Sequence, residues 1–494
     1  MTSETYTLAA IIIYMLAMLV IGWYSYRKTA NLTDYMLGGR SLGPAVTALS
    51  AGAADMSGWL LMGLPGAIYL SGMGEAWIAI GLTIGAYCNW LFVAPRLRVY
   101  TQVSNDSITI PSYLESRLKQ SSRLLRIASG LIILLFFTFY VSSGMVAGGV
   151  FFESSFGLDY HTGLLVVSAV VVSYTLFGGF LAVSYTDFLQ GLLMFLALIC
   201  VPIFGLFSTG GIGETVESIK SVNPTHLSLF AGTTFMGVLS AVAWGLGYFG
   251  QPHIIVRFMA ISSVKETKQA RRIGIGWMIL SLVGATATAL VGVAYFAQNP
   301  DVKLTDPEAV FISLGQIVFH PFIAGLVLAA VLAAVMSTIS SQLIVTSSVL
   351  VEDLYKAIIK SDAPDKTYVN YGRMAVLVVS IIAAILAWGE HDTILKLVSF
   401  AWAGFGSAFG PVILLSLYWK KITSSGAISG MIVGAVTVMI WGNVEILTET
   451  LYEIVPGFVL ALITTVIVSL ITYKPNPEIE KEFDETVRLL KESR

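Results

Sequence analysis

The sequence predicts an all-α integral membrane protein with thirteen transmembrane helices. Of its 494 residues, 56% are hydrophobic and only 12% are charged, which is about half the charged fraction of soluble domains. The apolar residues come in runs of roughly 20, the length at which a helix crosses a hydrocarbon layer of about 30 Å. Between the runs, lysine and arginine gather in alternate connections, as expected for connections on one side of a membrane.

The apolar runs define the expected spans. They cover residues 5–26, 44–70, 74–95, 124–150, 163–183, 188–208, 230–256, 274–297, 316–350, 372–388, 395–419, 425–443 and 452–472. We expect residues 1–473 to form one polytopic domain. In the polar tail, 474–494, apolar side chains recur at helical spacing, which predicts a short amphipathic helix that packs on the protein or lies at its surface.

The basic residues give the orientation. All but Lys220, Lys303 and Lys396 of the 28 lysines and arginines lie in or beside the connections that follow spans 1, 3, 7, 9 and 11, or in the tail. The positive-inside rule therefore predicts an N-terminus outside the cell and a C-terminus in the cytoplasm. An additional or missing helix would reverse the pattern in the downstream half, so the charges also support the count.

Composition excludes several classes of function. Cys88 and Cys200 both lie in apolar runs, which predicts neither a disulfide framework nor a metal site. The five histidines show no metal-ligand spacing, and no nucleophile is paired with a base. We therefore expect no enzymatic activity, no cofactor, no nucleic-acid partner and no obligate protein partner. The expected surroundings are those of a lipid bilayer.

Two runs are interrupted at corresponding positions. "GAADMSGWLLMGLPG", residues 52–66, breaks the second span, and "WGLGYFGQPH", residues 244–253, breaks the seventh. Either interruption alone fits close helix packing or an ordinary proline kink. Because the seventh span comes five spans after the second, spans 2–6 (about 44–208) and 7–11 (about 230–419) form two five-helix repeats of opposite orientation. Paired broken helices in inverted repeats indicate the central binding site of a transporter.

Polar side chains lie near the expected midplane of the membrane. Asp55 is roughly 16 Å into span 2 at 1.5 Å per residue, and a carboxylate at that depth is a functional residue by default. Its role is cation attraction, proton relay or a bond to backbone freed by the break. Ser337 and Thr338 are adjacent in span 9 and are either ligands of a small hard cation or helix packing contacts. For Ser340, Ser341, Thr346, Ser347 and Ser348 we expect bonds to their own helix or contacts between helices.

Two further groups of residues are of interest. Asp187 has no basic residue within 30 positions and lies at the expected start of span 6, where it either draws a cation or caps the helix. The aromatic residues beside the two breaks, among them Trp59, Tyr140, Trp244 and Tyr248, are central in depth. They are candidates for the apolar walls of a substrate pocket.

Long motifs resemble the sodium/solute symporter family over nearly the whole chain, and most closely its bacterial sodium/proline symporters. They include "TALSAGAADMSGWLLMGLPGA", "YTLFGGFLAVSYTDFLQG", "WGLGYFGQPHI", "VLAAVMSTIS" and "VEDLYK". The resemblance implies a leucine-transporter-like fold of two inverted five-helix repeats, with one helix before them and two after. That arrangement has thirteen spans, as do the apolar runs.

The resemblance also implies site residues. The sodium site is expected from the backbone carbonyls of Ala53, Met56 and Ala334 and the hydroxyls of Ser337 and Thr338. Asp55 is expected to be needed for sodium coupling, and Asp187 to lie on the cytoplasmic sodium release route. The expected substrate-binding residues are Ser57, Trp59, Tyr140, Trp244, Tyr248 and Pro252. Arg40 and Ser50 match functional positions near the inner end of span 2.

The function implied is sodium-coupled uptake of L-proline by alternating access, for nutrition or for osmotic protection, in a multi-pass protein of the bacterial plasma membrane. Another small amino acid or a betaine-like solute is the alternative cargo, and a proton or lithium ion the alternative coupling ion. A channel or a sensor on the same fold is a different class, but a tail of about 20 residues is too short for a signalling domain.

Overall fold

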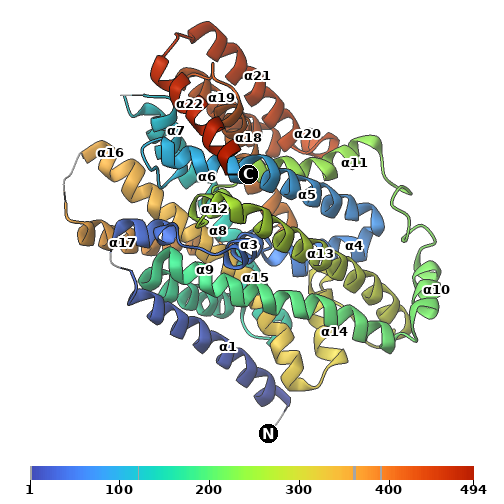
Figure 1. Ribbon diagram of the computed structural model, residues 1–494. Coiled ribbons are helices and arrows are strands. Elements are labelled where there is room, and N and C mark those ends of the chain that lie inside the picture. The colour runs from blue at the N-terminus through green and yellow to red at the C-terminus, as the bar shows by residue number, and fades with distance from the viewer. Residues whose placement is uncertain (1–2, 30, 121, 360–362, 390–391, 494) are drawn as a thin grey trace.

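The computed structural model describes residues 3–29, 31–120, 122–359, 363–389 and 392–493, and these residues form a bundle of helices (Figure 1). The described residues contain no strand, only one isolated bridge between Leu42 and Ile261. The expected all-α class is therefore confirmed. The bridge joins the start of the second span to the end of the seventh.

The helices of the first half are α1 (Ser3–Tyr26), α2 (Leu32–Leu37), α3 (Pro44–Asp55), α4 (Leu64–Ser71), α5 (Ala76–Cys88), α6 (Ala94–Val103), α7 (Ile110–Arg117), α8 (Leu124–Phe156), α9 (Tyr160–Ser208) and α10 (Ile212–Val222). Those of the second half are α11 (Phe235–Val242), α12 (Pro252–Ala260), α13 (Thr267–Gln298), α14 (Val310–Val318), α15 (Pro321–Ser348), α16 (Lys356–Ile359), α17 (Asp365–Leu386), α18 (Ile394–Tyr418), α19 (Ser424–Gly442), α20 (Glu445–Thr450), α21 (Ile454–Thr472) and α22 (Pro477–Glu492).

Short π-helical and 3₁₀ segments interrupt or extend several of these helices. The π-helical segments are η2 (Trp59–Gly63), η4 (Asn89–Val93) and η8 (Val349–Tyr355), and a 3₁₀ segment, η5 (Ala243–Gly250), separates α11 from α12. Shorter 3₁₀ turns are η1 (Gly38–Arg40), η3 (Met73–Glu75), η6 (Val264–Glu266) and η7 (Pro307–Ala309). Segments of π-helix are rare and often mark functional positions.

Ten of the described helices are long and apolar enough to cross a membrane. The second and seventh expected spans are not among the ten because their breaks divide them. Their apolar pieces, Trp59–Ser71 and Phe235–Gly250, are each shorter than 18 residues. The breaks predicted from sequence therefore account for most of the difference between ten candidates and thirteen expected spans.

The rest of the difference lies in α9, whose 49 residues would measure about 73 Å as one straight helix. Its path breaks at Gly179, which has φ 60° and ψ −154°. An added Cβ there would lie 2.6 Å from the Tyr35 ring, so both the conformation and the space demand glycine. The boundary expected at 184–187 is therefore wrong. An apolar run hides the change of direction, because only the glycine conformation marks it.

Helix α15 forms the centre of the bundle. It packs against α1, α8, α9 and α17, and its residues from Val327 to Ser348 are all buried. The run of alanine, valine and serine in this helix allows such close packing on every side. In Figure 1, α1 lies at one edge of the bundle, and α19 and α21 lie at the opposite edge.

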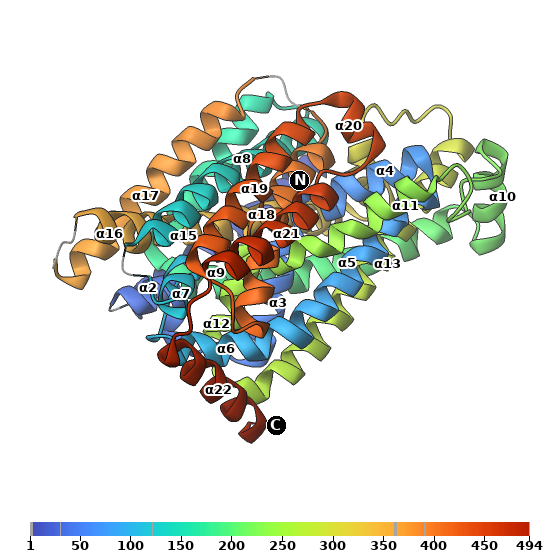
Figure 2. The same ribbon diagram turned by 90° about the horizontal axis from the view of Figure 1, so that it is seen from above.

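The predicted tail helix is confirmed as α22. Phe483 is 8% exposed, packs against Tyr100 at a ring distance of 6.3 Å and lies among the Arg96, Arg117 and Lys420 side chains. Figure 2 shows α22 beside α6, on the opposite side of the view from α4, α10 and α20. The tail is thus docked on the protein rather than free.

Candidate functional site

The break in the second span is produced by Met56 and Ser57. Helix α3 ends at Asp55, because Met56 has φ −78° and ψ 76°, outside helical geometry. The Ser57 amide then donates to the Asp55 carbonyl at 2.9 Å, and the Leu60 amide to the Ser57 carbonyl at 3.0 Å. Regular i to i−4 bonding is absent here, so backbone carbonyls near residue 53 are available to other partners.

The break in the seventh span depends on close approach to α18. Gly247 lies in η5, where an added Cβ would be 1.9 Å from Trp402 Nε1. Gly250 is similar, with the Phe405 carbonyl oxygen 2.3 Å from such a Cβ. Gln251 is extended, and Pro252 then begins α12, a position at which the missing amide hydrogen costs nothing. The glycines thus let two backbones meet at the break.

The structure brings four of the five expected sodium ligands together. The Ser337 hydroxyl donates to the Ala53 carbonyl at 2.7 Å and lies 3.1 Å from the Ala334 carbonyl, to which Thr338 Oγ1 donates at 3.3 Å. Met56 is buried at the end of α3, but none of the hydrogen bonds of the described residues joins it to either hydroxyl. Two carbonyls and two hydroxyls are an oxygen-only set of the kind that a small hard cation prefers.

Asp55 lies beside this oxygen cluster and is 2% exposed. Its Oδ2 accepts a short hydrogen bond from the Tyr248 hydroxyl, and its backbone carbonyl accepts from Trp59 Nε1 at 3.2 Å. Its Oδ1 has no hydrogen-bond partner in the part of the chain that the structure describes. A buried carboxylate is costly unless it is paired. Among the described residues, no cationic side chain pairs with this carboxylate.

Aromatic side chains from the two breaks form one cluster. Trp59 packs against Trp244 at a ring distance of 6.4 Å, and Tyr248 meets Trp402 edge to face at 5.1 Å. Trp402 Nε1 also donates to the Trp244 carbonyl at 2.7 Å. Tyr452 stacks on Trp244 at 5.3 Å, a contact that was not expected from the sequence. The cluster has the apolar walls and few polar groups typical of a small-molecule site.

The other expected substrate residues are placed differently. Tyr140 meets the His253 ring edge to face at 5.6 Å, and its buried hydroxyl has no partner among the described residues. Ser57 is buried, and its hydroxyl accepts from the Trp59 amide at 3.4 Å. Pro252 lines a separate small cavity with Val256, so its clearest contribution is to begin α12.

Asp187 is the centre of a buried network. Its Oδ2 accepts from Ser50 at 2.7 Å, from Arg257 at 3.0 Å and from Ser341 at 3.3 Å. Arg257 also donates to the Ser50 hydroxyl at 3.0 Å and to the Ser341 hydroxyl at 2.6 Å. All four side chains are fully buried. The network ties together α3, α9, α12 and α15.

This network corrects one expectation. Asp187 lies inside a helix, eight residues after Gly179, so it is not a helix cap. Ser341 bonds to Asp187 and Arg257 on two other helices, which is the helix–helix contact that was one of its two expected roles. The expected local bonds are confirmed for Ser340, Thr346, Ser347 and Ser348, whose hydroxyls donate to carbonyls three or four residues earlier.

Arg40 joins the start of the first repeat to the end of α12. It donates to the Met259 carbonyl at 2.8 Å and to the Ser107 carbonyl at 2.7 Å, and it pairs with Asp106 at 3.0 Å. Burial lowers the pKa of the Arg40 guanidinium from its ordinary value, and Asp106 opposes that shift. Arg40 and Ser50 therefore both contact the second half of the seventh span, Arg40 through Met259 and Ser50 through Arg257.

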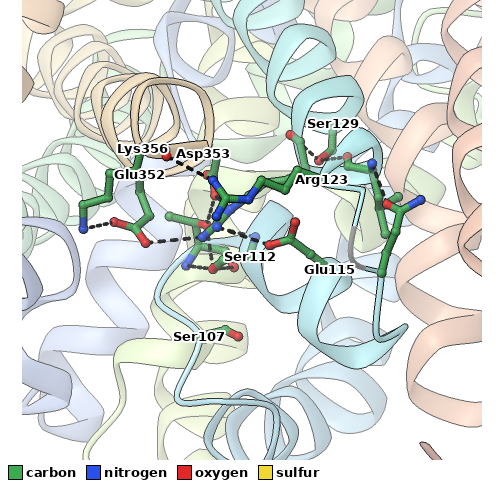
Figure 3. A network of polar contacts seen from close by, with 12 residues as sticks. Ser107, Ser112, Glu115, Arg123, Ser129, Glu352, Asp353 and Lys356 are labelled. Carbon is green, nitrogen blue, oxygen red and sulfur yellow. Dashed lines mark hydrogen bonds and ion pairs between the residues drawn. The ribbon is translucent and has the colours of Figure 1, made fainter. Parts of the chain in front are cut away.

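The "VEDLYK" motif forms a second network of charges (Figure 3). Arg126 of α8 pairs with Asp353 at 2.9 Å, with Glu352 at 3.3 Å and with Glu115 at 3.2 Å. Lys356 pairs with Glu352 at 2.7 Å. Figure 3 shows Glu352 and Asp353 of η8 and Lys356 of α16 across the network from Glu115 of α7. The network fixes the end of the ninth span to the start of the fourth.

Sequence reasoning missed Arg257, Asn89 and Tyr452. Arg257 was counted only as a basic residue of a connection, because its partner Asp187 is 70 residues away. Asn89 donates to the Tyr248 carbonyl at 3.0 Å and is 1% exposed. The polar amide of Asn89 inside an apolar run is the signal that could have identified it. Nothing in the sequence around Tyr452 indicated its contact with Trp244.

Known proteins resemble this chain in sequence and in fold. The sequence profile of the sodium:solute symporter family matches residues 35–434. The high-affinity proline transporter PutP of Bacillus subtilis (strain 168) is 62% identical over 95% of this chain and 98% of its own. The sodium/proline symporter 2 of Staphylococcus saprophyticus is 52% identical over 99% of this chain and 97% of its own.

Among solved structures, a Na+-coupled sialic acid symporter in a substrate-bound, outward-open state superposes with a TM-score of 0.81. It covers 95% of this chain and 98% of its own at 22% identity, which supports the fold alone. The family resemblance stated from the motifs is confirmed, because the profile covers most of the chain and the sequence relatives cover nearly all of it. This chain belongs to the sodium:solute symporter family.

Proposed function

We propose that this protein is a sodium-coupled symporter that carries L-proline into the cell. The observation that carries the proposal is the oxygen cluster formed by Ser337, Thr338, Ala53 and Ala334 at the break of the second span. The 62% identity to a proline transporter supports the cargo. The number of apolar helices and the family place the protein in the bacterial plasma membrane as a multi-pass transporter, not an enzyme.

The proposed architecture has thirteen spans, with the N-terminus outside and the C-terminus in the cytoplasm. Two observations support this count beyond the ten long helices: the two broken spans, and the double length of α9 with its break at Gly179. Repeat one covers about 44–208 and repeat two about 230–419. Each begins with a broken helix, as the leucine-transporter-like arrangement of inverted repeats requires.

In the proposed sodium site, the carbonyls of Ala53, Met56 and Ala334 and the hydroxyls of Ser337 and Thr338 hold the ion. Both hydroxyls now donate to carbonyls, and each would turn its oxygen to the ion on binding, since a hydroxyl both donates and accepts. Asp55 lowers the cost of placing positive charge at this depth, because no cationic side chain among the described residues pairs with its carboxylate.

Proline is proposed to bind where the aromatic cluster meets the two breaks. Its ring would pack on Trp59, Trp244 and Tyr248, and its polar ends would find Ser57 and the unpartnered Tyr140 hydroxyl. Pro252 supports the site by starting α12 at the right place. Sodium and proline then stabilise the same conformation, and each must raise the affinity of the other by the same factor.

On the inner side, we propose that Ser50, Asp187 and Arg40 belong to the route by which sodium leaves. Asp187 is held by Arg257 while α3 and α12 lie together. Separation of these helices would free the carboxylate to meet the departing ion. Arg40 is proposed to hold the turn after α6 against the end of α12 through Ser107 and Met259.

Sodium provides the energy for accumulation. One charge that crosses 100 mV is worth about 2.3 kcal/mol, and a tenfold sodium gradient adds about 1.4 kcal/mol. One sodium ion per proline therefore concentrates the substrate several hundred-fold, at roughly 1.4 kcal/mol per factor of ten.

The proposal is tested by uptake of radiolabelled proline into proteoliposomes under inward gradients of sodium, lithium or protons. We expect accumulation with sodium, and inhibition by unlabelled proline analogues but not by glycine betaine. Accumulation that depends only on a proton gradient, or inhibition by glycine betaine without inhibition by proline analogues, would overturn the ion or the cargo.

A further inference from the structure

A small cavity beside Asp55 is lined by two residues that each have a buried oxygen without a partner among the described residues. It lies between α3, η4, α12 and α13, and Asp55, Asn89 and Tyr248 are among its lining residues. Oδ1 of Asp55 and Oδ1 of Asn89 both lack a hydrogen-bond partner in the described part of the chain. The two side chains are 2% and 1% exposed. Unpaired acceptors at this depth are costly, so the cavity calls for a ligand that satisfies them.

Asn89 is held in one orientation by its own hydrogen bond. Its Nδ2 donates to the Tyr248 carbonyl at 3.0 Å. A flipped amide would place Oδ1 against that carbonyl, with two acceptors facing each other, so the oxygen is the group left unpaired. Asn89 is also the first residue of the π-helical segment η4, the kind of irregular turn often found at functional positions.

Tyr248 joins the two acceptors. Its hydroxyl donates to Oδ2 of Asp55, and its carbonyl accepts from Asn89. The backbones of the third and seventh spans touch one turn earlier, where a Cβ added to Gly85 would lie 2.2 Å from the Gly245 carbonyl oxygen. This contact fixes Asn89 against the broken span that carries Tyr248. The two hydrogen bonds and this close backbone approach therefore hold Asp55, Tyr248 and Asn89 next to one another.

The size and lining of the cavity restrict what can enter. Its volume is about 20 Å³, and roughly 10–15 Å³ measured in the same way holds one water molecule. A bare cation or a water fits, whereas a proline does not. Much of the remaining lining is apolar, including Ala51, Ala86, Ile254 and Met278. A carboxylate oxygen and an amide oxygen in an apolar cavity together favour a small hard cation.

We propose that Asp55 and Asn89 form a second sodium position, separate from the Ser337 and Thr338 cluster. The inference rests on the proposed sodium-coupled function and adds one ion to it. Asp55 then serves both positions: its backbone lies in the break beside Ala53, and its Oδ1 binds the second ion.

The test is the number of sodium ions bound per chain by the purified full-length protein, measured with ²²Na+ at equilibrium without proline. We expect two for the wild type. Ser337→Ala combined with Thr338→Ala should leave one, and Asn89→Leu should also leave one. A wild-type count of one would overturn the proposal whatever the variants do, and the cavity would then hold water. Sodium-driven proline uptake would still be expected in that case, so the proposed function would stand.

Two further variants separate ion binding from a structural role of Asn89. Asn89→Asp loses the bond to the Tyr248 carbonyl but keeps an oxygen for the cavity, so it should retain both ions, whereas Asn89→Leu should not. Ala86→Val fills the cavity without touching either oxygen, and it should also remove one ion. Ala79→Val on the same helix, outside the cavity lining, is the matched control and should bind two. Equal losses in Asn89→Asp and Asn89→Leu would contradict ion binding.

Discussion

The ion pair between Asp187 and Arg257 should dominate the local stability of the inner half of the bundle. Both side chains are fully buried, with 0% of their surface accessible to solvent. Asp187→Leu would leave the guanidinium with the hydroxyls of Ser50 and Ser341 and the His253 carbonyl, and no opposite charge. Arg257→Met would leave the carboxylate with only the two hydroxyls.

The magnitude follows from burial. Removal of one partner of a buried ion pair costs about 3–5 kcal/mol, because the other charge stays buried and unpaired. Replacement of both partners by apolar side chains of similar volume is often neutral. We therefore expect each single variant to lose about 3–5 kcal/mol of unfolding free energy, and the double variant Asp187→Leu/Arg257→Met to recover most of that loss.

The assay is unfolding of the purified protein by sodium dodecyl sulfate in mixed micelles, followed by circular dichroism. Ser340→Ala provides the control, since the Ser340 hydroxyl donates to the Ser337 carbonyl of its own helix and takes no part in the described hydrogen bonds of Asp187 and Arg257. A double variant that is as unstable as the sum of the two singles would refute the reasoning. So would single variants that unfold at the same detergent fraction as the wild type.

Three further outcomes are expected. Gly247→Ala should abolish proline binding measured by equilibrium dialysis, because the added Cβ would displace Trp402; unchanged binding would show that the break tolerates a side chain. Tyr140→Phe should leave stability unchanged, since its hydroxyl has no partner among the described residues, yet raise the KM for proline roughly tenfold; an unchanged KM would remove Tyr140 from the substrate site. Phe483→Ala should lose about 1.5–3 kcal/mol of tail docking and speed tryptic cleavage in the tail, and an unchanged cleavage rate would contradict that docking.

Much of the fold follows from local patterns in the sequence. The length of each apolar run predicts most of the helices, and glycine with proline predicts both broken spans. The exception is Gly179, whose positive φ turns the chain inside a continuous apolar run. Hydropathy carries no signal at such a point, because the residues on both sides of the turn remain apolar. The expected boundary was therefore several residues too late.

Some residues of the candidate site could likewise be expected from the sequence, and others could not. Asp55 was a candidate because a carboxylate at membrane depth is costly and stands out in the sequence, whereas the pattern at Ser337 and Thr338 left a cation ligand and a helix packing contact equally open. The partners of Asp187 could not be identified, since Arg257 is 70 residues away and belongs to another repeat. Pairings of this kind depend on the packing of helices, which one sequence does not reveal. Ser341 shows the same limit, as its bonds lead out of its own helix.

The central claim is that the hydroxyls of Ser337 and Thr338 hold the coupling sodium. The most direct test is the sodium dependence of proline uptake into proteoliposomes by Ser337→Ala, Thr338→Ala and the control Ser340→Ala. Loss of one oxygen ligand should raise the half-saturating sodium concentration roughly tenfold or more in the first two, while Ser340→Ala behaves as the wild type. Equal sodium dependence in all three variants and the wild type would contradict the account.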